Sequence, residues 1–535
     1  MYEPRFRRPP LASVRNKNFQ RNFEDTPKED ESVCNTISET YKEFAAISTV
    51  HGLKYTVHVK STWGKIFWTL VIILSVISAT QLAQKFYIRH KAANMRTLVI
   101  SNQYPSWYFS FPAITYCHST IASLHRIEEA LTTGTIRWPK DYTLQDLIKN
   151  LVFLREALIP TNRYPNQTQR LQRFLNANNF SLLELFKIVS LPCEDFIVLC
   201  RFEMEITPCE ELLTSTLTPY GLCCSYNYAR YNGEERYSYN LLIFTTQMLI
   251  QYSLTYLLPH RYKNLPEFRS PDFGMDFTLS VLVKSYPKED RLSFSMFGQG
   301  TKIIIHERNT YPGPSAQEFV AGFRQEVIGA FKGTQLIVSQ EIRDLPVEER
   351  DCCMSKPDSL YRADNCYVKC REKIIRNYCD CVPFYASIIY SNDTICNLTH
   401  VPCLVEHKSK YEDLNFRDKQ CGCKPDCEGT TFKVSTSSLD FIAAEHNPAD
   451  FYQTSLEYKN PTAIHIGYAS LTFMLQSREL VLSWINLVSS LGDVFSLFLG
   501  CSFVSIFEFF YYLGYLMWKL TRKKKPKAQV HPLSP

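Results

Sequence analysis

The sequence lacks the short motifs by which many enzymes are recognised. It contains no Gly-x-Ser-x-Gly turn, no phosphate-binding glycine loop and no His-Glu-x-x-His pair. No internal repeat or long low-complexity segment is present either. We therefore expect neither an enzyme nor a bound cofactor.

A strong excess of charge is also missing. The 59 basic and 53 acidic residues leave a net charge of +6, dispersed over 535 residues. Nucleic-acid-binding proteins rely on a concentrated basic surface. We expect no nucleic acid among the partners of this chain.

The first 63 residues lack an apolar run, so we do not expect a cleaved signal peptide there. The first apolar run extends from Ile66 to Gln84, with no charge between Lys65 and Lys85. Nineteen helical residues reach roughly 28 Å, which matches the hydrocarbon core of a bilayer. A buried core helix is the alternative, but the length favours a membrane span.

A second apolar region extends from Leu480 to Trp518 and contains only two charges, Asp493 and Glu508. Ionisable side chains at membrane depth usually face a protein interior or a water-filled path. Small residues lie in the same region: Ser489, Ser490, Gly492, Ser496, Gly500 and Ser502. Because small residues permit close approach of backbones, and broken helices are tolerated where they line a cavity, the pattern indicates a pore.

Cysteine is nearly absent outside one stretch. Seventeen of the 19 cysteines lie between Cys117 and Cys427, and only Cys34 and Cys501 fall outside. Such crowding is typical of an oxidising compartment. Four glycosylation sequons fall in the same stretch, at Asn166, Asn179, Asn392 and Asn397. We expect this region to be extracellular.

The topology follows from these features. Residues after the second span are basic without an acidic neighbour, which places the C-terminus in the cytosol and lets the tail contact anionic lipid. With an extracellular loop between the spans, both termini are cytosolic in a plasma membrane protein. The predicted segments are a cytoplasmic segment 1–63, a first span 64–86, an extracellular domain 87–479, a second span 480–519 and a cytoplasmic tail 520–535.

We expect the extracellular region to form a mixed α+β domain. Strand patterns occur in Phe277–Val283, Lys302–His306, Gln335–Ser339 and Ile464–Leu475, and amphipathic helix patterns in Leu144–Leu158 and Ala316–Phe331. Its densest cysteines lie between residues 352 and 427, where a zinc cluster is the rival interpretation. Two sequons in that segment, and adjacent or Cys-x-Cys pairs that do not easily bridge internally, favour disulfides and no metal. Counting alone leaves their connectivity open.

Four blocks together resemble the degenerin, epithelial sodium channel and acid-sensing channel superfamily, most closely its insect pickpocket branch. They are His51-Gly52, Phe111–Cys117 (FPAITYC), Tyr220–Asn227 (YGLCCSYN), and the cysteine array that leads to Ser489–Ser502 (SSLGDVFSLFLGCS). The resemblance spans about residues 45–520. It implies a subunit of an amiloride-sensitive, sodium-permeable cation channel, assembled as a homotrimer or as a heterotrimer with related subunits. Its stimulus is not indicated.

The resemblance also implies roles for single residues. Gly500, Cys501 and Ser502 match the Gly-x-Ser selectivity filter, although Cys501 replaces the usual alanine or serine. Ser489 matches the degenerin gate position, and Ser496 matches a position associated with amiloride block. Asp493, where the family usually has a small residue, is expected to form an acidic ring at the outer pore, and Glu508 an inner one. His51 and Gly52 match a gating motif.

The same resemblance implies a disulfide pattern. Its pairs are Cys117–Cys223, Cys193–Cys224, Cys200–Cys209, Cys366–Cys423, Cys370–Cys421, Cys379–Cys403, Cys381–Cys396 and Cys352–Cys427, with Cys353 as the other candidate for the last bridge. A scavenger-type two-span glycoprotein receptor shares the topology and is the alternative function. Such a receptor needs neither the charged, serine-rich second span nor this cysteine order. An ATP-gated channel shares the topology too, but it does not fit the first two blocks.

Overall fold

The computed structural model describes residues 29–92, 95–132, 134, 136–140, 142–229, 273–274, 277–313, 316–355, 361–387, 392–413, 419–442 and 450–523. Its contacts divide the chain into two compact units. The helical unit comprises Met1–Asn94 and Leu482–Pro535, and the sheet unit comprises Met95–Val481.

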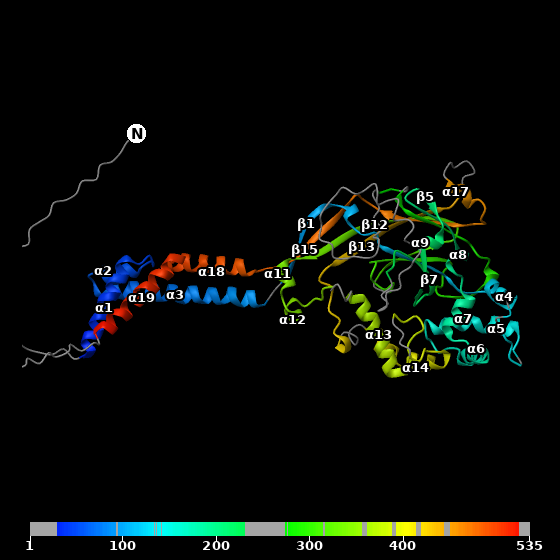
Figure 1. Cartoon of the computed structure of the whole chain (residues 1–535), viewed down its shortest axis with the longest axis horizontal. Coiled ribbons are helices and arrows are strands. Elements are labelled where there is room, and N and C mark those ends of the chain that lie inside the picture. The colour runs from blue at the N-terminus through cyan, green and yellow to red at the C-terminus, as the bar shows by residue number, and fades with distance from the viewer. Residues whose placement is uncertain are drawn as a thin grey trace, which may run out of the picture. The chain divides into compact units, whose positions relative to one another are not determined.

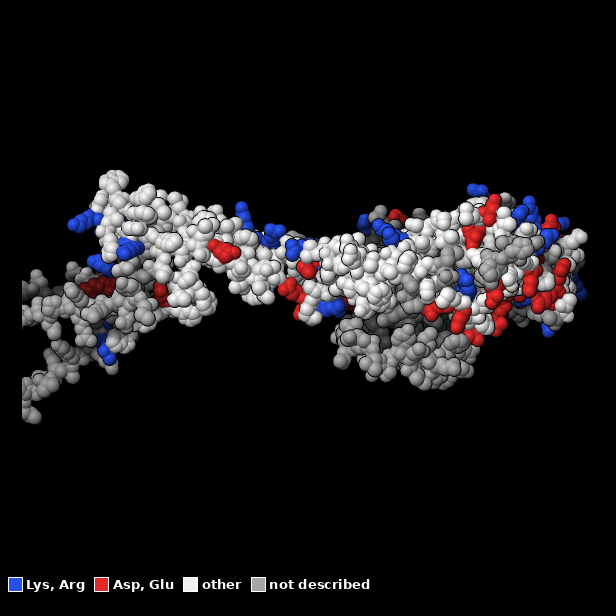
Figure 2. Space-filling model, turned by 90° about the horizontal axis from the view of Figure 1, so that it is seen from above, with Lys and Arg blue, Asp and Glu red and all other residues white. Residues whose placement is uncertain are grey.

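The helical unit contains the two apolar regions of the sequence. Its helices are α1 (Glu29–Ile47), α2 (Leu53–His58), α3 (Thr62–Lys91), α18 (Trp484–Leu499) and α19 (Phe503–Lys523). The 30 residues of α3 extend about 45 Å, and this helix is apolar enough to cross a membrane. Helices α18 and α19 meet at a 69° bend and together qualify as one further span. Only Ala79 of α3 is buried, and much of this unit's surface is uncharged (Figure 2).

Contacts between neighbouring helices organise this unit. Helix α18 lies beside α3, and α1 lies beside α19 and α2 (Figure 1). The ring of Phe44 in α1 packs against Phe509 and Tyr512 of α19, with centroids 6.3 and 5.3 Å apart. The segment before the first span is thereby attached to the second half of the second one.

The sheet unit is built around an eight-stranded mixed sheet. Its order is β1-β15-β12-β14-β8-β4-β5, and β13 also pairs with β12. The bounds are β1 (Met95–Pro105), β4 (Ile197–Phe202), β5 (Glu205–Thr207), β8 (Leu279–Val283), β12 (Gln325–Val338), β13 (Gly429–Asp440), β14 (Thr462–Tyr468) and β15 (Thr472–Leu480). The long strand β12 pairs with β13 along nearly its whole length, and with β14 and then β15 in parallel on its other side.

A five-stranded sheet of order β11-β10-β2-β7-β6 and a two-stranded sheet β3-β9 complete the β-structure. Their bounds are β2 (Ala113–His118), β3 (Thr120–Ser123), β6 (Leu213–Thr218), β7 (Gly221–Tyr226), β9 (Arg291–Phe294), β10 (Gly300–His306) and β11 (Gln317–Gly322). Phe111, Tyr226, Phe331 and Tyr468 belong to one continuous apolar core that both larger sheets share. The ring of Phe111 contacts the other three edge-on, at centroid distances of 5.3 to 5.8 Å.

Short helices cover the rest of this unit. They are η1 (Ser106–Tyr108), α4 (Leu124–Thr132), α5 (Leu144–Leu151), η2 (Val152–Ala157), α6 (Pro165–Asn178), α7 (Leu182–Val189), α8 (Cys193–Phe196), α9 (Cys209–Leu212), η5 (Lys288–Asp290), α11 (Gln340–Arg343), α12 (Val347–Arg350), α13 (Ala363–Cys379), η6 (Leu398–His400), α14 (Val401–Glu406), α15 (Lys408–Glu412) and α17 (Asp450–Ser455). Helices α5 to α7 form a second apolar core, and α13 packs on α14 and α15 around cystines.

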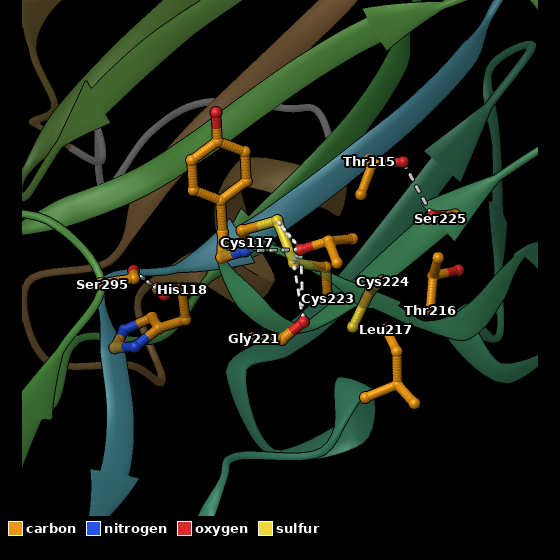
Figure 3. The surroundings of a disulfide bond; sticks show 12 residues. Thr115, Cys117, His118, Thr216, Leu217, Gly221, Cys223, Cys224, Ser225 and Ser295 are labelled. Atoms are coloured by element: carbon orange, nitrogen blue, oxygen red, sulfur yellow. Dashed lines mark hydrogen bonds between the residues drawn. A yellow bond between two sulfur atoms is a disulfide. The ribbon is translucent and has the colours of Figure 1, made fainter. Parts of the chain in front are cut away.

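Eight disulfides are present, and they are the pairs that the resemblance implies. They join Cys117–Cys223, Cys193–Cys224, Cys200–Cys209, Cys352–Cys427, Cys366–Cys423, Cys370–Cys421, Cys379–Cys403 and Cys381–Cys396. Figure 3 shows the bridge between Cys117 and Cys223 beside the adjacent Cys224, which has a different partner. Successive residues of β7 point to opposite faces, so Cys223 reaches Cys117 of β2 while Cys224 reaches Cys193 of α8.

The predicted helix at Ala316–Phe331 is wrong. These residues form strand β11, a turn and the first half of β12. Arg324 takes a left-handed conformation in the turn, at φ 59°. A side chain at Gly329 would press against Phe319, with only 3.0 Å from a Cβ atom to the ring. Pairing with neighbouring strands therefore outweighs the amphipathic pattern. The predicted strand Ile464–Leu475 is in fact two strands, parts of β14 and β15.

Candidate functional site

The break in the second apolar region falls at Gly500, Cys501 and Ser502. Gly500 ends α18 in a left-handed conformation, at φ 65°, and its N–H donates to the carbonyl of Ser496. This is the usual helix end at a glycine, which tolerates positive φ without strain. The α-helix resumes at Phe503. The three residues matched to the filter thus form the non-helical backbone between the two halves.

His51 lies directly against this break. Its backbone N–H donates to the carbonyl of Leu499 at 2.7 Å. A Cβ atom placed on Gly500 would lie 2.5 Å from Cδ2 and Nε2 of the His51 ring. Gly52, at φ 87°, reverses the chain so that α2 can begin. The structure therefore brings the His-Gly pair and the Gly-Cys-Ser segment together, although they are far apart in the sequence.

A chain of polar contacts continues below the break. The N–H of Ser502 donates to the Ser505 hydroxyl at 2.9 Å. The Ser505 hydroxyl lies 2.6 Å from that of Thr49, and Thr49 donates to Oε2 of Glu508 at 3.4 Å. The N-terminal segment and α19 are joined by hydroxyls at a depth where polar groups need partners.

Helix α18 presents one polar face. Ser489, Asp493 and Ser496 are spaced four and three residues apart, so they share a face of the helix, and all three are exposed. None of these side chains bonds to another residue in the described part of the chain. In particular, Asp493 lacks the helix partner that a purely structural role would require.

The opposite face of α18 is the one that packs. Leu487 and Val494, seven residues apart, are the buried residues of this helix. They lie roughly half a turn away from the polar face, and α3 is the helix beside α18. Within one chain, the polar face is therefore turned away from the protein.

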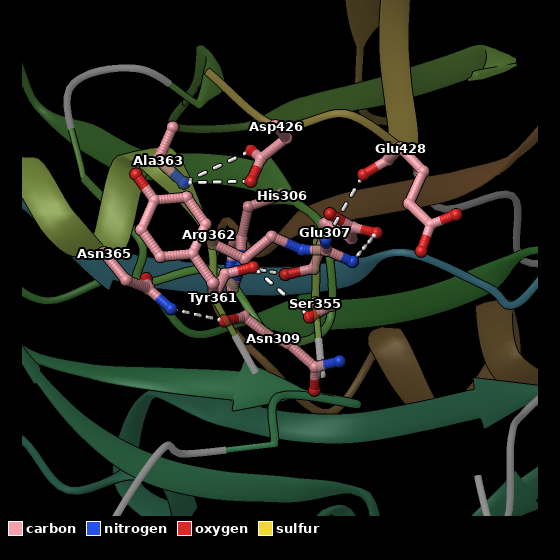
Figure 4. Close-up of polar contacts among 10 residues, drawn as sticks. All are labelled: His306, Glu307, Asn309, Ser355, Tyr361, Arg362, Ala363, Asn365, Asp426 and Glu428. Carbon is pink, nitrogen blue, oxygen red and sulfur yellow. Dashed lines mark hydrogen bonds and ion pairs between the residues drawn. The ribbon is translucent and has the colours of Figure 1, made fainter. Parts of the chain in front are cut away.

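The sheet unit contains a separate polar cluster where α13 begins (Figure 4). Asp426 accepts the N–H of Ala363 with both carboxylate oxygens, at 3.1 and 3.3 Å. Arg362 donates to Glu307 at 2.8 Å and to the carbonyl of Glu428 at 3.3 Å. Burial raises the pKa of Asp426 to about 6, against the effect of the nearby Arg362 charge. Burial likewise raises the pKa of Glu307, which Arg362 opposes.

The four sequon asparagines differ in their surroundings. Asn166, Asn179 and Asn392 are exposed. Asn397 is half-buried, and its side-chain oxygen accepts the N–H and the hydroxyl of Thr399. Among the described residues, no group of three or more His, Cys, Asp or Glu side chains could hold a metal ion.

Sequence reasoning missed the partners that surround the predicted residues. It singled out His51, Ser502 and Glu508, but neither Thr49 nor Ser505, which connect Ser502 to Glu508. It also missed the cluster of Arg362 and Asp426. The available signal was weak: Ser505 is one hydroxyl among apolar residues three positions after Ser502.

Comparison with known proteins gives a consistent result. The family model described as "Amiloride-sensitive sodium channel" matches residues 44–512. Sodium channel protein Nach of Drosophila melanogaster is 26% identical over 500 residues, covering 90% of this chain and 88% of that protein. Pickpocket protein 28 of the same species is 24% identical, covering 95% and 84%. The bile acid-sensitive ion channel of Rattus norvegicus is 22% identical, covering 88% and 86%.

Proposed function

The chain belongs to the amiloride-sensitive sodium channel family, and from this premise we propose that it is one subunit of a trimeric, sodium-permeable cation channel. Both termini are cytosolic in this proposal, and the sheet unit is extracellular in the plasma membrane. Three identical or related subunits surround the conduction path for sodium and other monovalent cations.

The polar face of α18 is the observation that carries this proposal. Ser489, Asp493 and Ser496 point away from the packed face of their own chain and lack partners there. Lipid is a costly neighbour for an unpaired carboxylate. Association of three copies around these faces removes them from lipid and surrounds water with three carboxylates. The non-helical backbone at Gly500–Ser502 follows at the end of the same face.

Roles of single residues follow from this arrangement. Gly500, Cys501 and Ser502 form the filter, with carbonyl oxygens that replace part of the cation's hydration shell. Ser489 is the gate position, Asp493 and Ser496 line the outer pore where amiloride binds, and Glu508 supplies the inner charge. His51 and Gly52 support the filter from the cytosolic side.

Gating starts in the extracellular domain, through a chemical or mechanical stimulus. The cystines around α13 make that part of the domain stiff, which suits the transmission of movement. Asn166, Asn179, Asn392 and Asn397 are its proposed glycosylation sites. A two-span receptor, the alternative function, gains nothing from an unpaired carboxylate on an exposed face of α18.

Ion-replacement recordings test the proposal. We expect currents that reverse near the sodium equilibrium potential in cells that express the chain alone or with related subunits, and block by amiloride. Biotinylation of the cell surface verifies that the protein has arrived there. A chain that reaches the surface but carries no cation current with any related subunit, across force, acid and chemical stimuli, contradicts the proposal.

A further inference from the structure

Ser505 differs from its neighbours on α19. Its side chain is buried, with 7% exposure, whereas Phe503, Val504, Ile506 and Phe507 are exposed. A polar group that is buried at membrane depth needs partners, because an unpaired one is costly there. The Ser505 hydroxyl has such partners on both sides of the break in the second span.

The contacts form a chain of hydrogen bonds. The N–H of Ser502 donates to the Ser505 hydroxyl, and the hydroxyls of these two residues lie 3.3 Å apart. The Ser505 hydroxyl also shares a hydrogen bond of 2.6 Å with the Thr49 hydroxyl, in which either oxygen can be the donor, and Thr49 lies 3.4 Å from Oε2 of Glu508. Bonds in such a chain polarise one another and act as a unit.

We propose that Ser505 is a positioning residue for the filter: its hydroxyl fixes the backbone of Ser502 against Thr49 of the N-terminal segment and thereby sets cation selectivity. This inference rests on the proposed channel function. It adds a specific link between parts of the chain that lie 456 residues apart. Ser505 does not contact the ion itself.

The physical reason is the break in the helix. At Gly500–Ser502 the helical hydrogen bonds are interrupted, so other contacts must hold the filter backbone. The N–H of Ser505 donates to the carbonyl of Ser502 while its hydroxyl accepts the N–H of Ser502. Ser505 therefore holds both backbone polar groups of the residue at which the filter ends. Without the hydroxyl, the N–H of Ser502 loses its partner, and only the bond from the Ser505 N–H to the Ser502 carbonyl still holds this residue.

The experiment measures the sodium-to-potassium permeability ratio under bi-ionic conditions. This ratio does not depend on how many channels reach the surface, so a purely structural defect leaves it unchanged. We expect Ser505→Ala and Ser505→Cys to lower the ratio roughly threefold to tenfold, the range that one hydrogen bond supports. Ser505→Thr retains the hydroxyl and should restore the ratio. Wild-type selectivity in the Ala or Cys variant overturns the inference.

Thr49→Val tests the second half of the link. Because Thr49 and Ser505 act through one chain, the double variant should be no less selective than Ser505→Ala alone. If the losses of selectivity in the two single variants add up in the double variant, the link between Thr49 and Ser505 is contradicted. Thr69→Val is the matched control, since the exposed Thr69 hydroxyl donates only within α3, to the carbonyl of Lys65.

A second measurement does not need a current. Thr49→Cys combined with Ser505→Cys, in a chain with Cys34 and Cys501 changed to serine, should form a disulfide on mild oxidation of membranes. Mass spectrometry detects the crosslinked peptide. No crosslink overturns the contact, even where the variants are silent. A wild-type chain without current in any combination contradicts the channel function instead, and leaves the crosslink as the measure of the geometry.

Discussion

Asp493 is the only charge on α18, and it has no partner within the described part of its own chain. In a three-fold assembly around the polar face, three carboxylates raise the local concentration of cations. We expect Asp493→Asn to lower single-channel sodium conductance roughly twofold at low ionic strength, and less at high salt because of screening. Asp493→Glu preserves the charge and serves as the control. Equal conductance of Asn and wild-type channels would place the carboxylate outside the conduction path.

Asp426 makes stability depend on pH. Burial raises its pKa from the ordinary 3.8 to about 6, so the fold favours the neutral carboxyl. The contribution of the neutral Asp426 carboxyl to the free energy of unfolding is complete below pH 3.8 and is lost as the pH rises through about 6. At pH 7.4, Asp426→Asn removes the buried charge and keeps an oxygen for the N–H of Ala363. We expect its melting temperature to exceed that of the wild type by about 1–3 °C, a small shift because Asp426 is only partly buried.

Thermal unfolding of the detergent-solubilised chain at pH 7.4 and pH 4 checks this expectation. The difference in melting temperature between the variant and the wild type should shrink at pH 4. At that pH the Asp426 carboxyl of the folded wild type is neutral, as the asparagine of the variant is. Asp364→Asn, in the half-buried first turn of α13, is the control for a general loss of negative charge near Arg362. A variant that is less stable than the wild type at pH 7.4 would mean that the charge on Asp426 supports the start of α13.

The polar face of α18 is the one proposed to line the pore, and the opposite face packs beside α3. Substitutions on the two faces should therefore have different effects. Ser489 is exposed on the polar face, so a large side chain there costs little within one chain but crowds the axis of an assembly. We expect Ser489→Phe to hold the gate open and give a constitutive current several-fold above the wild type. Resting current in the absence of a stimulus is the measurement. Val494→Phe, on the packed face, should instead reduce surface expression. A Ser489→Phe channel that stays closed at rest would contradict the gate assignment.

An element could be predicted from the sequence where the residues that determine it lie within the element itself. The first span was predictable because Ile66–Gln84 carries the whole signal locally, as an apolar run without charge. The break at Gly500 was indicated by local small residues in the same way. Strands β11 and β12 were not, because the alternate burial of Val327, Gly329 and Phe331 is created by strands that pair from elsewhere in the chain.

The same reasoning applies to the site. Residues of the filter segment could be matched one by one, whereas the bond between Thr49 and Ser505 joins residues 456 positions apart and has no local signature. Asp426 is a similar case. It acts as the cap of α13 from outside that helix, because Arg362 at the N-cap provides no side-chain acceptor. Disulfide connectivity came from the resemblance, since seventeen crowded cysteines allow many pairings.

The distribution of thiols over the whole molecule tests both the pairing and the proposed topology. The described residues include three free cysteines, Cys34, Cys353 and Cys501. Only Cys353 belongs to the sheet unit, where it is half-buried next to the bridge of Cys352 and Cys427. If that unit is extracellular, a membrane-impermeant maleimide on intact cells should reach Cys353 but not the exposed Cys34. Permeabilisation should then add the label on Cys34.

We expect Cys353→Ser to lose the label on intact cells while Cys34→Ser retains it. Any residual label in Cys353→Ser should disappear in the double variant with Cys501→Ser, because Cys501 is accessible only through an open pore. Labelling that persists in the double variant even after Cys34 is also changed to serine would show that one of the eight bridges is open. Labelling of Cys34 on intact cells would reverse the orientation of the chain. Because each cysteine belongs to a different predicted compartment, one reagent can test the cystine framework and the two-span topology together.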